Sequence, residues 1–148
     1  MTQEDKKLLF KDLCARLDTN LVCSIYRIDD YGVGYRDEIL HGYCKGDIWY
    51  EFYFGEDCGI GIDNVSKIKP YLFPLSSMTK DQREELYKIG WYLDGDKIYS
   101  CFRNYDDENY KTHTDCFELI NWCYENHFDI NGLIPRGLAE DATDKNIY

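Results

Sequence analysis

The stretch from residue 21 to residue 62 constrains the fold most strongly, because it predicts several β-strands joined by very short turns. Residues 21–28 (LVCSIYRI) and 48–54 (IWYEFYF) are rich in the β-branched and aromatic side chains typical of strands. Residues 35–44 and 58–62 fit two further strands, and the turn sequences DDYG and KGD separate the first three. Sequential strands with such short gaps predict an antiparallel sheet, which could curl into a small barrel.

A helix is predicted before this sheet. Thr2 and Asp5 have the spacing of a variant capping box, in which each side chain satisfies a backbone N–H of the first turn. Leu9, Leu13 and Leu17 recur at helical spacing and predict one apolar face that packs on the sheet.

Two further helices are predicted in the second half of the chain. Thr79 and Gln82 fit a capping box at the start of one, and Gly90 fits its end. The other begins near residue 115. Between them, residues 97–102 fit another strand after the turn sequence DGD.

Together these patterns predict a single α+β domain over residues 1–148. It contains an N-terminal helix, an antiparallel sheet or small barrel of four to five strands, and two helices in the C-terminal half that close the core. Residues 68–75, which contain two prolines, are predicted to be extended or irregular and to lie across the core. The polar segment 104–114 is predicted to be a mobile loop, and residues 140–148 a weakly ordered tail.

The helix near residue 115 presents an apparent stripe of thiol, imidazole and aliphatic groups. Cys116, Leu119, Ile120, Cys123 and His127 recur at intervals of three and four residues and are predicted to share one face. Cys123 and His127 could both reach one metal ion. Cys116 lies about 10 Å from Cys123 along the axis, and a fourth ligand would have to come from elsewhere. Core packing is therefore the preferred interpretation, and no metal site or cofactor is predicted.

His127 and Asp129 allow two interpretations. Asp129 could orient His127 as a general base, which would suit a hydrolase or nuclease. It could equally cap the backbone after the turn, with Gly132 in a left-handed conformation, and this second interpretation needs no substrate.

The net charge of the chain limits the kinds of molecule that it is expected to bind. The chain carries 17 basic and 28 acidic residues, for a net charge of −11. Phosphate backbones are bound by clustered Lys and Arg, so direct binding to nucleic acid is disfavoured and a basic protein surface is favoured. No apolar run approaches the roughly 20 residues that cross a bilayer, and the N-terminal sequence lacks signal-peptide order. We therefore expect no membrane contact and a cytoplasmic location, with the seven cysteines as free thiols.

Aromatic residues suggest where a binding surface could lie. Fourteen tyrosines exceed what one core buries, and six aromatic residues of the strand region could share an outer face: Tyr26, Tyr31, Tyr35, Tyr43, Trp49 and Tyr53. Such a face could anchor a protein or stack on a base. The predicted ligand-binding set combines aromatic rings with arginines for phosphate: Tyr26, Arg27, Tyr35, Arg36, Trp49, Tyr53 and Arg103. The alternative is that these tyrosines bind no ligand and are ordinary residues of a partly solvent-exposed sheet.

Three segments, KDLCARL (11–17), IKPYLFPLSSMT (68–79) and NHFDINGLIPRGLA (126–139), resemble a family of small uncharacterised proteins from gut Bacteroidales and their phages. The resemblance covers both ends and the middle of the chain. It implies an origin in a phage or mobile element, and it implies no catalytic residues.

Three functions remain open from the sequence. The favoured one is a non-enzymatic acidic interaction protein that binds a host protein, for example as an inhibitor of a host defence protein. The first alternative is a binder that sequesters a small nucleotide-like signal. The second is a hydrolase or nuclease that uses His127 and Asp129.

Overall fold

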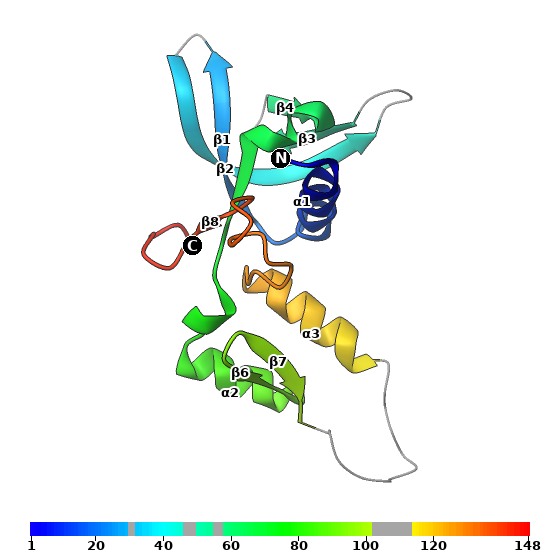
Figure 1. The fold of residues 1–148 in the computed structure, drawn as a ribbon, viewed down its shortest axis with the longest axis vertical. Coiled ribbons are helices and arrows are strands. Elements are labelled where there is room, and N and C mark those ends of the chain that lie inside the picture. The colour runs from blue at the N-terminus through cyan, green and yellow to red at the C-terminus, as the bar shows by residue number, and fades with distance from the viewer. Residues whose placement is uncertain (30–31, 46–49, 55–57, 102–113) are drawn as a thin grey trace.

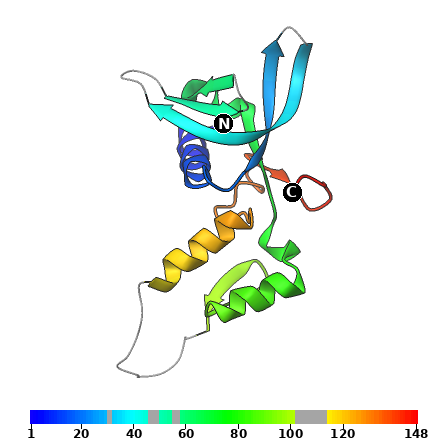
Figure 2. The ribbon, with the colours of Figure 1, turned by 180° about the vertical axis from the view of Figure 1, so that it is seen from behind.

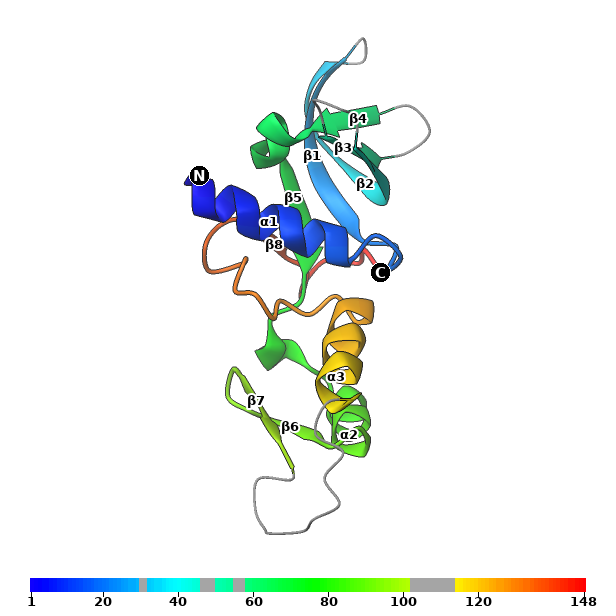
Figure 3. The same cartoon turned by 90° about the vertical axis from the view of Figure 1, so that its right-hand side faces the viewer.

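The protein has two lobes, each with its own hydrophobic cluster (Figures 1 and 3). The computed structural model describes residues 1–29, 32–45, 50–54, 58–101 and 114–148. One lobe contains the large sheet and the first helix. The other contains the two remaining α-helices and a small β-hairpin. The α+β class predicted from the sequence is confirmed.

The first helix, α1 (Gln3–Ala15), begins with the predicted capping box. The Thr2 hydroxyl accepts from the Asp5 backbone N–H, and the Asp5 carboxylate accepts from the Thr2 backbone N–H. Leu9 and Leu13 are fully buried against the inner face of the sheet. Phe10 extends this contact, with its ring 5.4 Å from that of Phe52.

The large sheet has the strand order β4-β3-β2-β1-β5-β8. Its strands are β1 (Val22–Asp29), β2 (Gly32–Lys45), β3 (Tyr50–Phe54), β4 (Cys58–Gly61), β5 (Ile68–Leu72) and β8 (Glu140–Asp141). All neighbours are antiparallel except β5 and β8, which are parallel. Because β4 and β8 end the order without pairing with each other, the sheet is open and mixed rather than a closed barrel.

The segment predicted to be extended or irregular is a strand inside this sheet. After a 3₁₀ turn (Ile62–Lys67), β5 pairs with β1 and not with β4, its nearest strand in sequence. Ile68 and Leu72 are fully buried. A second 3₁₀ turn (Leu75–Ser77) then leads the chain out of the sheet and into the other lobe.

The second lobe contains α2 (Lys80–Lys88), the hairpin of β6 (Trp91–Asp94) and β7 (Lys97–Ser100), and α3 (Thr114–Glu125). Thr79 and Gln82 form the predicted capping box of α2, and Gly90 follows with a φ of 87°. These elements surround a cluster of buried residues: Met78, Leu86, Cys123 and Phe128. The two C-terminal-half helices therefore close this second cluster, whereas Leu133, Leu138 and Ala139 complete the cluster under the sheet.

The predicted stripe on the last helix holds only in part. Leu119 and Cys123 face the second cluster, but Cys116 is exposed and Ile120 is 40% exposed. His127 lies beyond the end of α3 at a φ of 56°, so helical spacing no longer applies to it. The stripe fails at His127 because the helix stops at residue 125. Cys116 and Ile120 lie within α3 but are not buried in the cluster.

Residues 140–148, for which the sequence predicts a weakly ordered tail, pack against the sheet. Ala142 is fully buried, and its N–H donates to the Leu72 carbonyl. The Tyr148 hydroxyl donates to the Tyr71 carbonyl at 2.8 Å and accepts from the Val22 N–H at 3.3 Å.

Of the loop predicted for residues 104–114, residues 104–113 lie outside the described part of the chain, and Thr114 begins α3. None of the helices in the described ranges has the length and apolar character that crossing a bilayer requires.

Candidate functional site: an outer sheet face and an apolar groove

The β1–β2 hairpin presents an uncovered apolar face. It projects beyond the rest of the sheet (Figure 2). Its register pairs Tyr26 with Tyr35, Ile28 with Val33 and Val22 with Ile39. Directly paired residues of an antiparallel ladder point to the same side of the sheet. Cys23 and Ile25, which alternate with these residues, are fully buried on the inner side. The pairs therefore lie on the outer face.

Four side chains on this face are exposed although they are apolar or aromatic: Ile28 (72%), Val33 (65%), Tyr35 (62%) and Ile39 (39%). The Tyr26 ring packs edge-on against Tyr35 with a centroid distance of 5.2 Å. We call these five residues the hairpin face. Contiguous apolar side chains on a surface are typical of interaction sites, whereas isolated ones are ordinary.

An acidic group lies within the hairpin face. Asp37 follows Tyr35 by two residues and therefore points to the same side, where it is exposed. The Tyr71 hydroxyl donates to the Asp37 carboxylate at 2.8 Å, which fixes the position of the charge. The hairpin face thus combines apolar contact area with a positioned negative charge.

Two arginines of the predicted ligand-binding set, Arg27 and Arg36, do not lie on the same face as Tyr26 and Tyr35. Arg27 and Arg36 alternate with Tyr26 and Tyr35 along the two strands, so they project from the opposite side of the hairpin. Arg27 forms an ion pair with Glu38 and is half-buried. Base-stacking rings and phosphate-binding guanidinium groups are therefore not brought together on one face of this hairpin.

The remaining members of the predicted set lie apart or outside the described residues. Tyr53 is half-buried on β3, and its hydroxyl donates to Glu51 at 3.4 Å. Trp49 and Arg103 lie outside the described residues, as does Tyr31.

Tyr43 is on the inner side of the sheet, contrary to the predicted outer face. Its ring packs against those of Phe10 and Phe52, with centroid distances of 5.6 Å and 5.7 Å. The register of β2 against β3 shifts between Leu40 and Gly42. Such a β-bulge inserts one residue and exchanges the two faces of the strand beyond it.

Asp129 acts as a backbone cap at the junction of the two lobes. Its two carboxylate oxygens accept from the N–H groups of Leu133 and Ile134, both at 2.8 Å, and Gly132 has a φ of 68°. The structure shows no hydrogen bond between Asp129 and His127, both of which it describes. This geometry agrees with the capping interpretation.

His127 is buried at the same junction. Its ring stacks on that of Tyr148 with centroids 3.9 Å apart, and its Nδ1 has no hydrogen-bond partner in the described part of the chain. Burial, with a smaller contribution from the positive charge of Arg16, lowers the pKa of His127 to about 4. The imidazole is therefore neutral near pH 7.

A buried ion pair lies beside this junction. Arg16 donates to Asp12 at 2.8 Å, and both side chains are fully buried. Arg16 also donates to the Phe128 carbonyl at 2.8 Å and lies over the Tyr124 ring. These contacts join α1 to the chain after α3, so we interpret the pair as a structural link between the lobes.

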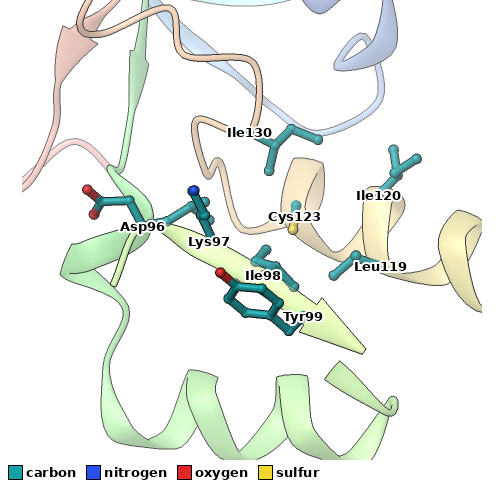
Figure 4. A pocket seen from close by; sticks show the side chains of 9 residues that line it. Asp96, Lys97, Ile98, Tyr99, Leu119, Ile120, Cys123 and Ile130 are labelled. Carbon is teal, nitrogen blue, oxygen red and sulfur yellow. The ribbon is translucent and has the colours of Figure 1, made fainter. Parts of the chain in front are cut away.

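An apolar groove separates β7 from α3 (Figure 4). Its volume is about 400 Å³, and its lining includes Ile98 and Tyr99 from β7 and Leu119, Ile120 and Cys123 from α3. A second hollow of about 410 Å³ continues from it toward residues 129–135, with Leu75, Asp96 and Ile130 lining both. Figure 4 shows the Lys97 ammonium and the Tyr99 hydroxyl at the same side of the groove. Burial raises the pKa of the Cys123 thiol to about 11, so this thiol is protonated at neutral pH.

In the part of the chain that the structure describes, no group of three or more His, Cys, Asp or Glu side chains is placed to hold a metal ion. Comparisons with protein-family models, with curated proteins and with solved structures gave no match.

Sequence reasoning named Tyr26 and Tyr35 but missed Ile28, Val33 and Ile39. Their signal was present, because all three alternate in step with the tyrosines along two strands. The groove could not be found in this way, since its walls come from segments about 20 residues apart in sequence whose packing no local pattern encodes.

Proposed function

We propose that this protein is a non-enzymatic interaction protein that binds a basic surface of another protein through the hairpin face. The observation that carries the proposal is the set of exposed apolar side chains on the outer side of β1 and β2, which none of the helices that the structure describes covers. Binding is favourable when a partner covers such an apolar sheet face, because removing apolar surface from water lowers the free energy.

Charge supports the choice of a basic partner. The chain has a net charge of −11, and Asp37 places one carboxylate inside the hairpin face. Complementary charge steers association and disfavours acidic competitors. The resemblance of three segments to proteins of gut Bacteroidales and their phages suggests one form of this binding, the inhibition of a host defence protein.

A pair of matched variants tests the proposal. Val33→Thr/Tyr35→Thr removes apolar area from the hairpin face while retaining residues that favour strands. Tyr87→Gln/Phe117→Gln removes a similar area from the exposed sides of α2 and α3. The immobilised proteins are incubated with bacterial lysate, and bound proteins are quantified by mass spectrometry. We expect at least one basic protein that the wild type and the α2/α3 variant retain and that the hairpin variant loses.

The purified partner then gives a second measurement. Its affinity should fall as salt rises, because ionic screening weakens attraction between exposed charges of opposite sign. If no bound protein depends on Val33 and Tyr35, or if the affinity of the retained protein is independent of salt, the proposal is wrong.

A further inference from the structure

The groove between β7 and α3 is apolar along most of its walls. Ile98 contributes to one wall, and Leu119, Ile120 and Cys123 form the other. The Cys123 thiol adds no charge, because it is protonated at neutral pH, and Ile120 remains 40% exposed to solvent. The volume of about 400 Å³ lies within the range of small-molecule sites. These walls therefore suit a large apolar group, whose transfer out of water is favourable.

Polar groups lie at one end of this groove. In Figure 4 the Asp96 carboxylate, the Lys97 ammonium and the Tyr99 hydroxyl are on one side, and the residues of α3 are on the other. Asp96 and Lys97 are exposed, and neither forms an ion pair with any residue in the described ranges of the chain. Among the same residues the Tyr99 hydroxyl has no hydrogen-bond partner. All three groups are thus available to a ligand.

Asp96 and Lys97, both of which the structure describes, carry opposite charges and do not pair with each other. A ligand with a single charge would be attracted by one of them and repelled by the other. A ligand that carries both an ammonium and a carboxylate group can pair with both, and such charge-assisted hydrogen bonds are stronger than neutral ones. Asp129, an acid that lines the adjoining hollow, already accepts two backbone N–H groups. Asp96 is therefore the described lining carboxylate that remains available to a ligand ammonium.

We propose that this groove binds a free α-amino acid with a large apolar side chain. The side chain of the ligand lies between β7 and α3. Its ammonium group pairs with Asp96, and its carboxylate pairs with Lys97 and accepts a hydrogen bond from the Tyr99 hydroxyl. This site is separate from the hairpin face and does not depend on the function proposed for it.

Isothermal titration calorimetry on the full-length protein tests the proposal. The ligands are leucine, isoleucine, methionine and phenylalanine, with alanine as the amino acid that lacks a large side chain. We expect at least one of the four to bind about tenfold or more tightly than alanine, which leaves the apolar walls uncovered. Ile120→Gln should weaken this binding about fivefold or more. Phe117→Gln, which removes an exposed aromatic side chain of the same helix outside the groove, should leave it unchanged.

Derivatives of the tightest-binding amino acid show which of its charged groups contacts which side chain. The N-acetyl derivative lacks the ammonium group, and the amide lacks the carboxylate. Each should bind the wild type about tenfold more weakly than the free amino acid, the effect of losing one charge-assisted hydrogen bond. Acetylation should cost little further affinity for Asp96→Asn, and amidation little further for Lys97→Met, because the group removed from the ligand has already lost its partner.

Glu118→Gln is the matched control for the two charge variants, since it removes an exposed charge of α3 that does not line the groove. This variant should bind the amino acid and its two derivatives as the wild type does, and so should Val33→Thr/Tyr35→Thr. The proposal is overturned if none of the four amino acids binds, or if Ile120→Gln binds them as the wild type does. It is also overturned if acetylation costs Asp96→Asn, or amidation costs Lys97→Met, as much affinity as it costs the wild type.

Discussion

His127 is kept neutral by its surroundings, and this links the stability of the protein to pH. Its pKa is about 4 in the folded protein and near the ordinary value of 6.5 in the unfolded chain. Between these values the unfolded chain binds more protons than the folded protein. The contribution of His127 to the free energy of unfolding is therefore complete above pH 6.5 and is lost as the pH falls toward 4.

We expect urea unfolding to show a larger loss of stability between pH 7 and pH 4.5 for the wild type than for His127→Asn. Asparagine tolerates the positive φ of this position and has no proton to gain. The variant should be less stable at pH 7, because it loses the stack on Tyr148. Equal losses in the two proteins would show that His127 does not set this pH dependence.

The ion pair of Asp12 and Arg16 should be sensitive to the loss of one partner. Asp12→Ala leaves a buried guanidinium group without its counter-charge, so we expect a loss of about 3 kcal/mol in the free energy of unfolding. Glu84→Ala breaks the exposed pair of Lys80 and Glu84 and should cost less than about 0.5 kcal/mol. Chemical denaturation measures both. A loss under about 1 kcal/mol for Asp12→Ala would argue against a structural role.

At the scale of elements, the turn between α3 and residue 134 depends on one carboxylate. Asp129→Ala removes two buried hydrogen-bond acceptors and should lower the free energy of unfolding by about 2 kcal/mol. Asp141→Ala removes an exposed acceptor of the Thr143 N–H and should cost about 0.5 kcal/mol. Thermal and urea unfolding of the two variants provide the comparison, and equal effects would exclude a special role for the cap.

Local sequence signals predicted local features well. Thr2 with Asp5 and Thr79 with Gln82 were sufficient to place two helix starts, because a capping box involves only neighbouring residues. The bulge between Leu40 and Gly42 was missed, and with it the inward orientation of Tyr43. A bulge depends on how a partner strand is placed, which the residues of one strand do not encode.

Pairing between distant segments was the other part that the sequence could not provide. The two prolines of residues 68–75 predicted an extended or irregular segment across the core, but not that it would form a strand between β1 and β8. The hairpin face could have been predicted from the sequence, because Ile28, Val33, Tyr35 and Ile39 alternate along two strands. Whether a helix would cover that face depended on the placement of helices distant in sequence, and α1 packs on the other face of the sheet.

For the whole molecule, two hydrophobic clusters predict two regions of different stability. Leu86 is fully buried in the second cluster, and Leu86→Ala should cost that lobe about 3 kcal/mol. We expect hydrogen exchange followed by mass spectrometry to show faster exchange in α2 and the β6–β7 hairpin, with smaller changes in β1, β2 and β5. A uniform increase across both lobes would show that the protein unfolds as one cooperative unit.

The bond from Arg16 to the carbonyl of Phe128 spans 112 residues, and Leu133, Leu138 and Ala139 complete the cluster under a sheet that begins at Val22. During synthesis, the ribosome must therefore add more than a hundred residues after β1 before the sheet lobe can acquire these closing side chains. The β1–β2 hairpin, which needs only neighbouring residues, can form early. Until then the part of the inner face that Leu133, Leu138 and Ala139 cover stays exposed in the nascent chain. This interval is when we expect the protein to depend most on chaperones.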